Sequence, residues 1–219
     1  IGACARAIKN FNFNKLLVIN PKPVFPNDKI IATSVGANEI IKNCKVFENL
    51  ESSIKKIDYL VATSARFRNK NIKHIDLSDL SKLDFNRRIG FLFGSEASGL
   101  SNSEIIYANC TMQIPSNPNF KSLNLSHSVI IVAHIVSSLI KLKKIRYKKS
   151  KKVRSASKKE IQSMVNLCIQ KLESKNFFGQ SEKKPIMLEN LKNIFYKMEL
   201  SEKETRILSS VFANLAKKG

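Results

Sequence analysis

Residues 114–125 read Ile114-Pro115-Ser116-Asn117-Pro118-Asn119-Phe120-Lys121-Ser122-Leu123-Asn124-Leu125, a polar stretch that leads directly into a long apolar segment. Small and polar residues of this kind leave many backbone donors and acceptors free for a flat, polar ligand. A short apolar run, residues 111–114, comes just before and is interpreted as a strand. Open α/β sheets bind their ligands in the loops that follow their strands, so this stretch indicates both the fold class and the place of a site.

Short apolar runs alternate with helical patterns along the first two thirds of the chain. We predict strands over residues 16–20, 44–47, 59–63, 89–93 and 111–114, and helices over residues 1–10, 33–43, 50–57, 101–109 and 123–142. The polar residues 66–86 are predicted to be irregular. This alternation is typical of a mostly parallel sheet with helices on both faces. Strands buried on both faces read as continuous apolar runs, as these do.

The predicted helix over residues 123–142 is apolar on nearly all of its faces. Its apolar residues are Val129, Ile130, Ile131, Val132, Ile135, Val136, Leu139 and Ile140. A helix without a polar face is buried, so we expect this one to be covered either by its own domain or by a partner. His127 and His134 lie seven residues apart and share one side of it, and they are expected to be satisfied in a core or an interface.

The pattern changes after residue 156. Ser157 with Glu160, and Ser201 with Glu204, match capping boxes that begin helices, and residues 187–198 carry a further apolar stripe at helical spacing. A small core shared by these helices explains the stripes. We therefore divide the chain into a domain over residues 1–142, a basic linker over residues 143–156 and a C-terminal helical unit over residues 157–219.

The composition is that of a globular protein. Hydrophobic residues make up 43% of the chain, which excludes global disorder. No apolar run reaches the length of a membrane span, and the start has no signal or transit pattern. The four cysteines are far apart, and the three histidines do not cluster with them. We therefore expect no metal site and a cytoplasmic protein with reduced thiols.

The net charge of +21 is concentrated toward the C-terminus. Residues 141–219 hold 21 Lys and Arg against 7 Asp and Glu, and residues 141–159 hold eleven basic residues and no acidic one. Such a density repels itself unless a polyanion lies nearby. Nucleic acid is the favoured partner, because each neutralised phosphate releases counterions. A solvated linker in a lysine-rich chain is the alternative.

Four segments of small and polar residues are candidates for a ligand site: residues 1–7, 61–66, 94–100 and 114–125. The last three follow predicted strands, so we expect them to meet at one edge of the sheet and to enclose one pocket. Gly94 and Gly99 permit a turn that side chains would block. The turn lacks the endings of a P-loop and of G-x-G-x-x-G, which disfavours nucleoside triphosphates and dinucleotides.

In combination, the segments resemble the three motifs of the SPOUT-class, TrmH-like RNA ribose methyltransferases. Ile1-Gly2-Ala3-Cys4-Ala5-Arg6-Ala7 is similar to motif one, the Phe-Gly-Ser-Glu-Ala-Ser-Gly-Leu of residues 93–100 to motif two, and Ile114-Pro115 with residues 122–126 to motif three. Residues 62–66 and the helical unit look most like the TrmJ branch. That branch methylates the ribose 2′-hydroxyl of nucleotide 32 in the tRNA anticodon loop.

The resemblance covers nearly the whole chain and implies a fold and a cofactor. The fold is the SPOUT α/β-knot, in which a mostly parallel sheet contains a deep trefoil knot, here with a small C-terminal helical unit added. The knot loops hold S-adenosylmethionine, and a homodimer completes the pocket. The implied cofactor contacts are Val61, Ala62, Thr63, Gly94, Glu96, Ile114, Lys121, Ser122 and Leu123.

The resemblance also implies roles in catalysis and RNA binding. The expected catalytic residues are Arg6, Ser122 and Asn124. Because a guanidinium stays protonated in proteins, we expect Arg6 to hold the adjacent phosphate and to stabilise charge on the ribose oxygen. The expected RNA contacts are Arg66, Arg68, Lys143, Lys144, Arg146, Lys148, Lys149, Lys151 and Lys152.

One departure from the family pattern leaves the function open at this stage. The chain begins at Ile1, so the family's first strand and its motif-one asparagine are not in it, and a chain truly shortened there would have an incomplete sheet. A tRNA 2′-O-methyltransferase is the favoured function, and an rRNA 2′-O-methyltransferase is the nearest alternative. The third is a non-catalytic RNA-binding module with a decayed pocket.

Overall fold

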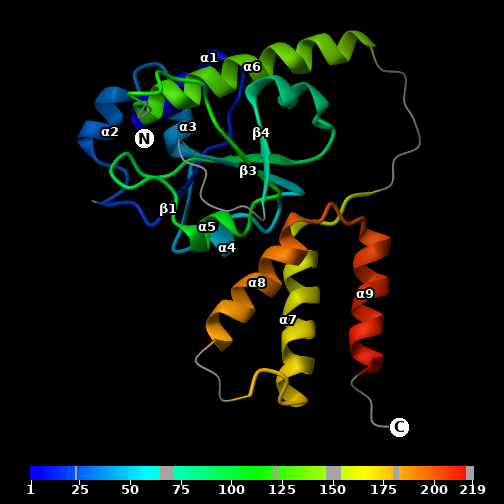
Figure 1. Ribbon diagram of the computed structural model, residues 1–219. Coiled ribbons are helices and arrows are strands. Elements are labelled where there is room, and N and C mark those ends of the chain that lie inside the picture. The colour runs from blue at the N-terminus through cyan, green and yellow to red at the C-terminus, as the bar shows by residue number, and fades with distance from the viewer. Residues whose placement is uncertain (23, 65–71, 121–122, 147–153, 180–182, 216–219) are drawn as a thin grey trace.

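The computed structural model describes residues 1–22, 24–64, 72–120, 123–146, 154–179 and 183–215, with backbone only at residues 142–146 and 215. An α/β part is followed by a helical unit (Figure 1). The α/β part contains α1 (Gly2–Asn10), β1 (Leu17–Ile19), α2 (Asp28–Thr33), α3 (Asn38–Lys42), β2 (Lys45–Phe47), α4 (Leu50–Ser53), β3 (Tyr59–Thr63), β4 (Lys73–Ile75), the 3-10 helix η1 (Leu77–Lys82), β5 (Ile89–Leu92), α5 (Asn102–Ile105), β6 (Cys110–Met112) and α6 (Leu125–Arg146). The helical unit contains α7 (Lys158–Ser174), α8 (Lys184–Lys197) and α9 (Glu202–Leu215).

All strand pairs among the described residues are parallel. β3 pairs with β5 on one side and with β6 on the other, and β4 pairs with the outer side of β6, which gives the order β4-β6-β3-β5. β1 and β2 form a separate two-stranded sheet. The predicted α/β fold with parallel strands is confirmed, and the carboxyl ends of β3, β5 and β6 lie at the same edge of one sheet.

Helices cover both faces of the four-stranded sheet because the side chains of β3 alternate between them. Leu60 and Ala62 face a core closed by residues of α4 and α5. Tyr59 and Val61 face a second core closed by α6 and η1. Figure 1 shows α1 and α6 side by side over one face, with α4 and α5 on the other side.

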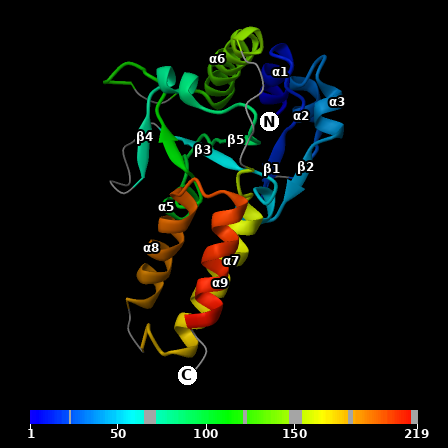
Figure 2. The same ribbon diagram turned by 90° about the vertical axis from the view of Figure 1, so that its right-hand side faces the viewer.

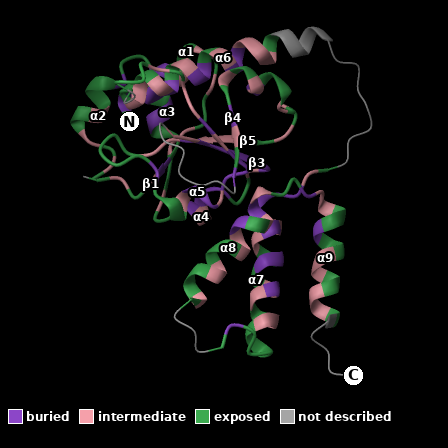
Figure 3. Ribbon diagram, viewed as in Figure 1, coloured by how far each residue is buried: buried purple, intermediate pink, exposed green. Residues whose placement is uncertain are grey.

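The helical unit packs around α7, whose buried face is visible in Figure 3. Ile161, Met164 and Val165 form a core with Tyr196 and Leu200, and the rings of Phe195 and Phe212 lie 5.8 Å apart. The Ser157 amide donates to Glu160 Oε2 at 2.7 Å, and Ser201 makes the same bond to Glu204. The predicted capping boxes at these two helix starts are therefore formed. Figure 2 shows α7 and α9 running next to each other below the sheet.

Two predictions about local structure are wrong. The helix predicted over residues 33–43 is shortened to α3, because the chain turns before Asn38 and Gly36 adopts a φ of +75°. α2, which ends at Thr33, lies before that turn and was not predicted. Part of the segment predicted to be irregular forms β4 and η1. β4 has only three residues and pairs with β6. A strand this short depends on its partner, so its own sequence carries too little alternation to reveal it.

Candidate functional site

The candidate site starts at the carboxyl ends of β3, β5 and β6, which lie next to one another. Ala62 is aligned with Leu92 of β5 and Thr63 with Met112 of β6. The Thr63 hydroxyl donates to the Leu92 carbonyl at 2.9 Å, and the Ser64 amide donates to the Met112 carbonyl at 2.9 Å. These bonds hold the three strand ends together. The segments that leave them therefore start from one place, as the sequence predicts.

The turn after β5 is closed tightly around Gly94. A Cβ atom on Gly94 would lie 2.1 Å from the carbonyl carbon of Gly99, so no other residue fits there without moving the backbone. Gly99 has a φ of +67°, which favours glycine for a different reason. The Ser95 and Ser98 hydroxyls lie 2.8 Å apart across the turn. The turn is thus fixed in shape while its hydroxyls and carboxylate stay exposed.

Glu96 connects this turn to the start of α6. Its Oε1 accepts a hydrogen bond from the Leu125 amide at 3.3 Å. That amide belongs to the first turn of α6, where backbone donors have no partner within the helix, and a negative charge is favoured there. Motif two and the end of motif three are therefore in contact, although 29 residues separate them.

Motif one reaches the same place from α1. Cys4 and Ala7 form a buried cluster with Val129 of α6, and Phe93 and Leu125 pack against it. All three motifs thus share one small core. Burial raises the pKa of the Cys4 thiol, so this sulfur is not an activated nucleophile. Arg6, on the opposite side of α1, is exposed.

The predicted cofactor residues fall into two groups. Val61 and Ala62 are fully buried, so they could offer a ligand only backbone atoms, whereas Thr63 and Gly94 are partly exposed and Glu96 is exposed. Ile114 packs partly buried against the core below α6, and Leu123 is exposed. Lys121 and Ser122 lie outside the described residues.

Asn124 has a structural task that sequence reasoning missed. Its Oδ1 accepts from the Ser126 amide at 2.9 Å and from the Ser126 hydroxyl at 2.7 Å. An asparagine oxygen that binds an amide two residues later is the usual N-cap arrangement, and the signal was present in the Asn-Leu-Ser order. The Asn124 oxygen thus stabilises the start of α6, which limits its part in the chemistry to the amide nitrogen.

The histidines of α6 are not in a core of this chain. His127 and His134 are both exposed, and the ring of His134 meets Phe11 edge-on at 5.3 Å. On α6, Val129, Val132, Ala133, Val136 and Ser137 are buried in this chain, whereas Ile130 is 36% exposed. The outer face of α6 is left open, which leaves an interface as the remaining interpretation of the histidine pair.

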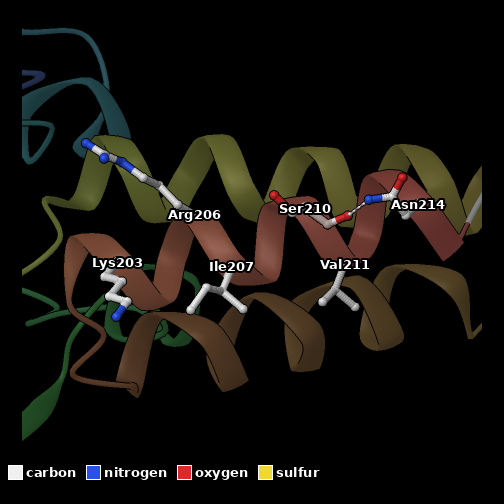
Figure 4. A pocket seen from close by; sticks show the side chains of 6 residues that line it. All are labelled: Lys203, Arg206, Ile207, Ser210, Val211 and Asn214. Atoms are coloured by element: carbon white, nitrogen blue, oxygen red, sulfur yellow. Dashed lines mark hydrogen bonds between the residues drawn. The ribbon is translucent and has the colours of Figure 1, made fainter.

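The predicted RNA contacts fall largely outside the described structure. Lys143, Lys144 and Arg146 belong to the last turns of α6, but their side chains are not described. The others, Arg66, Arg68, Lys148, Lys149, Lys151 and Lys152, are outside the described residues. Two grooves lie elsewhere. One of about 630 Å³ follows α9 (Figure 4), and one of about 290 Å³ is lined by the first residues of β3, β4 and β5.

The described part of the chain shows neither a membrane-spanning helix nor a cluster of metal ligands. None of the described helices is long and apolar enough to span a bilayer. Within the same residues, no group of three His, Cys, Asp or Glu side chains is placed to hold a metal ion.

Comparison with known proteins points to one family. The model of the SpoU rRNA Methylase family matches residues 1–134. The tRNA (cytidine-2'-O-)-methyltransferase TrmJ of Methanocaldococcus jannaschii is 30% identical over 97% of this chain and 92% of its own length. That of Sulfolobus acidocaldarius is 35% identical over 61% of this chain, which spans only 58% of that relative. The crystal structure of TrmJ from Z. mobilis has the same fold, with a TM-score of 0.86 over 99% of this chain and 93% of that one, at 24% identity.

Proposed function

This chain belongs to the SpoU rRNA methylase family, and we propose that it is an S-adenosylmethionine-dependent methyltransferase that acts on a ribose 2′-hydroxyl of tRNA. The names of its TrmJ relatives support tRNA as the substrate. Nucleotide 32 of the anticodon loop is the position that the sequence resemblance implies. A tRNA substrate and free cysteines are in keeping with a cytoplasmic protein.

The observation that carries this proposal is the meeting of the three motifs at one edge of the sheet. Cys4, Phe93 and Leu125 come from three different motifs and share one core. The Glu96 carboxylate joins two of the loops. Loops with a packing role alone would not need exposed hydroxyls and a carboxylate at their tips.

The donor set of these loops fits S-adenosylmethionine. Backbone groups at the end of β3 and in the 94–100 turn suit the edge of an adenine and the ribose hydroxyls, and the tightly closed glycine turn lets the backbone approach a ligand. Thr63, Gly94, Glu96 and Leu123 would hold it, with Lys121 and Ser122 from the third loop. When bound, the cofactor supplies a methyl group activated on a sulfonium.

The task left to the protein is to orient the ribose and to stabilise the negative charge that develops on its 2′-oxygen. Holding a hydroxyl in line with the reacting carbon can contribute on the order of 7–11 kcal/mol at the ideal limit. Arg6 is exposed on α1, whose other side packs into the motif core. Its guanidinium is thus available to grip the phosphate beside the target ribose and to stabilise charge that develops on the oxygen.

We propose that the active form is a homodimer, with α1 and α6 at its centre. On α6 the open face presents His127, Ile130 and His134, and Ile130 is 36% exposed. On α1 the neighbouring face presents Ala3 and Arg6. A symmetric dimer pairs the same patch on both copies, so Arg6 of each copy would lie near the boundary between the two pockets.

The strand order supports a knot in the same part of the chain. β6 comes last in sequence but lies between β3 and β4, which are consecutive. The deep trefoil knot that the resemblance implies is consistent with this order and is part of the proposal.

The helical unit is proposed to bind RNA together with the basic linker, residues 143–156. The groove along α9 is flanked by Lys203 and Arg206, while Ile207 and Val211 point into it (Figure 4). Arg206 is also paired with Glu202 at 2.6 Å. The proposed domain division is residues 1–142, 143–156 and 157–219.

Transfer of a tritiated methyl group tests the function directly. We expect bulk tRNA to be labelled on ribose and purified rRNA not to be. The description of the matching family favours rRNA as the second candidate, so labelling of rRNA alone would move the assignment there. RNA binding without transfer to either substrate would leave only the non-catalytic RNA-binding module.

A further inference from the structure

Lys158 is buried at the boundary between the two parts of the molecule. It is the first residue of α7 and is 1% exposed. Its ammonium group donates to the Tyr196 carbonyl at 2.9 Å and lies 5.3 Å from the centre of the Tyr196 ring. A charged lysine ammonium has three N–H donors, and fully buried lysines are rare unless they are paired with an acid. This burial therefore calls for an explanation.

Backbone hydrogen bonds attach the helical unit at the same place. The Lys158 amide donates to the Ile57 carbonyl at 2.7 Å, and the Lys159 amide donates to the Lys55 carbonyl at 3.2 Å. These are first-turn donors of α7, which have no partner inside the helix. The rings of Tyr107 and Tyr196 also meet edge-on across the boundary at 5.0 Å. We call this boundary the seam: residues 55–59, 87, 88, 107 and 110 on one side, and residues 158–160, 196 and 199 on the other.

The charged groups around Lys158 do not favour a positive charge on its amine, because Arg87 already places a cation nearby. Arg87 stacks on the Tyr59 ring at 5.0 Å and pairs with Glu199 at 2.5 Å, while its Nε is buried without a hydrogen-bond partner among the described residues. The guanidinium of Arg87 repels a charged amine, whereas Glu199 and the Cys110 thiol act in the opposite direction and more weakly. The remaining titratable groups at the seam are Lys55, Lys56, Asp58, Tyr59, Arg88, Tyr107, Lys159, Glu160 and Tyr196, of which Asp58 and Arg88 pair with each other.

We propose that Lys158 is a positioning residue that holds the helical unit against the α/β part, and that the docked arrangement is favoured when its amine is uncharged. A neutral amine still donates one hydrogen bond to the Tyr196 carbonyl. It avoids both the desolvation of a charge and the repulsion from Arg87.

The direction of the pH dependence follows from the two states of the amine. Burial, and then Arg87, lower the pKa of Lys158 from 10.5 to about 7. The undocked, exposed amine therefore binds more protons than the docked one between pH 7 and 10.5. Docking is weakest below pH 7 and strengthens as the pH rises through this window. Between pH 6.5 and 8.5 the docking equilibrium changes by up to about 25-fold.

Hydrogen exchange at the seam tests the proposal without RNA. The probes are the Lys158 and Lys159 amides, whose acceptors lie across the seam, and protection is corrected for intrinsic exchange at each pH. In the wild type we expect protection to rise up to about 25-fold from pH 6.5 to 8.5. In Lys158→Met, which keeps the unbranched apolar stem but lacks the amine and cannot be charged, we expect no rise.

Lys159→Met is the matched control, because Lys159 is exposed and its loss should leave the rise unchanged. Unchanged protection of the β3 amides shows that the opening is local. An equal rise in Lys158→Met, or no rise in the wild type, would overturn the proposal. If the methionine variant does not fold, Lys158→Gln serves in its place.

The consequence for catalysis rests on the proposed function. Docking sets where the helical unit stands relative to the pocket, so KM for RNA should fall from pH 6.5 to 8.5 in the wild type and stay level in Lys158→Met, with kcat equal in the two. Absence of methyl transfer in every variant would overturn the proposed function, and the exchange result would still decide the role of Lys158.

Discussion

At the scale of single residues, the site separates side chains that shape the loops from those free to act. Gly94, Glu96 and Asn124 are engaged with the protein itself, through a closed turn and two bonds at the start of α6. Arg6 is exposed on a helix whose other side is anchored in the motif core. This contrast makes Arg6 the residue whose loss should affect chemistry and little else.

Replacing Arg6 by alanine should abolish methyl transfer while leaving S-adenosylmethionine binding intact. The guanidinium is proposed to hold the RNA phosphate and the ribose oxygen, and it takes no part in the packing of α1. Tritium transfer measures the first effect, and titration calorimetry measures the second. Arg6→Lys, which keeps the charge and loses the planar fork, should retain part of the activity. Loss of cofactor binding in Arg6→Ala would contradict this assignment.

The two glycines of motif two should respond differently to alanine. Gly94→Ala places a Cβ against the backbone of Gly99, so the turn must open and cofactor binding should be lost. Gly99→Ala meets no atom within 4 Å, and its left-handed backbone costs only about 1–2 kcal/mol. Thermal unfolding and calorimetry on both variants compare them. Equal cofactor affinity in the two would show that the closed turn does not shape the pocket.

At the scale of elements, α6 is a helix with two different faces. Val129, Val132 and Val136 are buried against the sheet and α1, and the opposite face leaves Ile130 and two histidines open. A helix of such even apolar character is usually covered on both sides. The open face is the reason for placing the proposed dimer contact here.

Ile130→Asp should convert a dimer into monomers and reduce methyl transfer, since a carboxylate at the centre of an apolar contact is left unpaired. Sedimentation equilibrium gives the mass, and tritium transfer gives the activity. Val211→Asp is the control, because Val211 is similarly exposed but belongs to α9. Dissociation by Val211→Asp with Ile130→Asp still dimeric would place the contact on the helical unit.

At the scale of the whole molecule, the site and the helical unit lie at opposite ends of the parallel strands. The motif loops follow the carboxyl ends of β3, β5 and β6, whereas the seam lies before β3 and β5. Figure 1 shows α7–α9 on the side away from α1 and α6. An RNA that contacts both must therefore extend along the molecule.

The charge of the linker should appear in the salt dependence of RNA binding. Each phosphate contact contributes about 0.7–0.9 to the slope of log K against log salt. Changing Lys148, Lys149, Lys151 and Lys152 to alanine should therefore lower the slope by up to about 3, as measured by fluorescence anisotropy. The same change at Lys15, Lys22, Lys42 and Lys45, which are exposed and lie outside the seam, is the matched control. Equal slopes in both variants would show that the linker is solvated and does not contact the RNA.

Sequence alone was sufficient for the class of fold, the two capping boxes at Ser157 and Ser201 and the motif loops, because each of these depends on local chemistry. Buried runs of β3 and β5, the Ser157 and Ser201 boxes, and the glycines of residues 94–100 are all legible in a few consecutive residues. The family could also be identified from the sequence, because the residues of the three motifs and their order along the chain can be read directly.

Only the tertiary structure decided what depends on partners distant in sequence. β4 exists because β6 lies beside it, and the outer face of α6 is open because nothing in the described chain covers it. Lys158 is buried through a contact with Tyr196, which lies 38 residues away in sequence. A lysine in a basic stretch looks like its exposed neighbours, and its environment is set only when α7 is packed against the sheet.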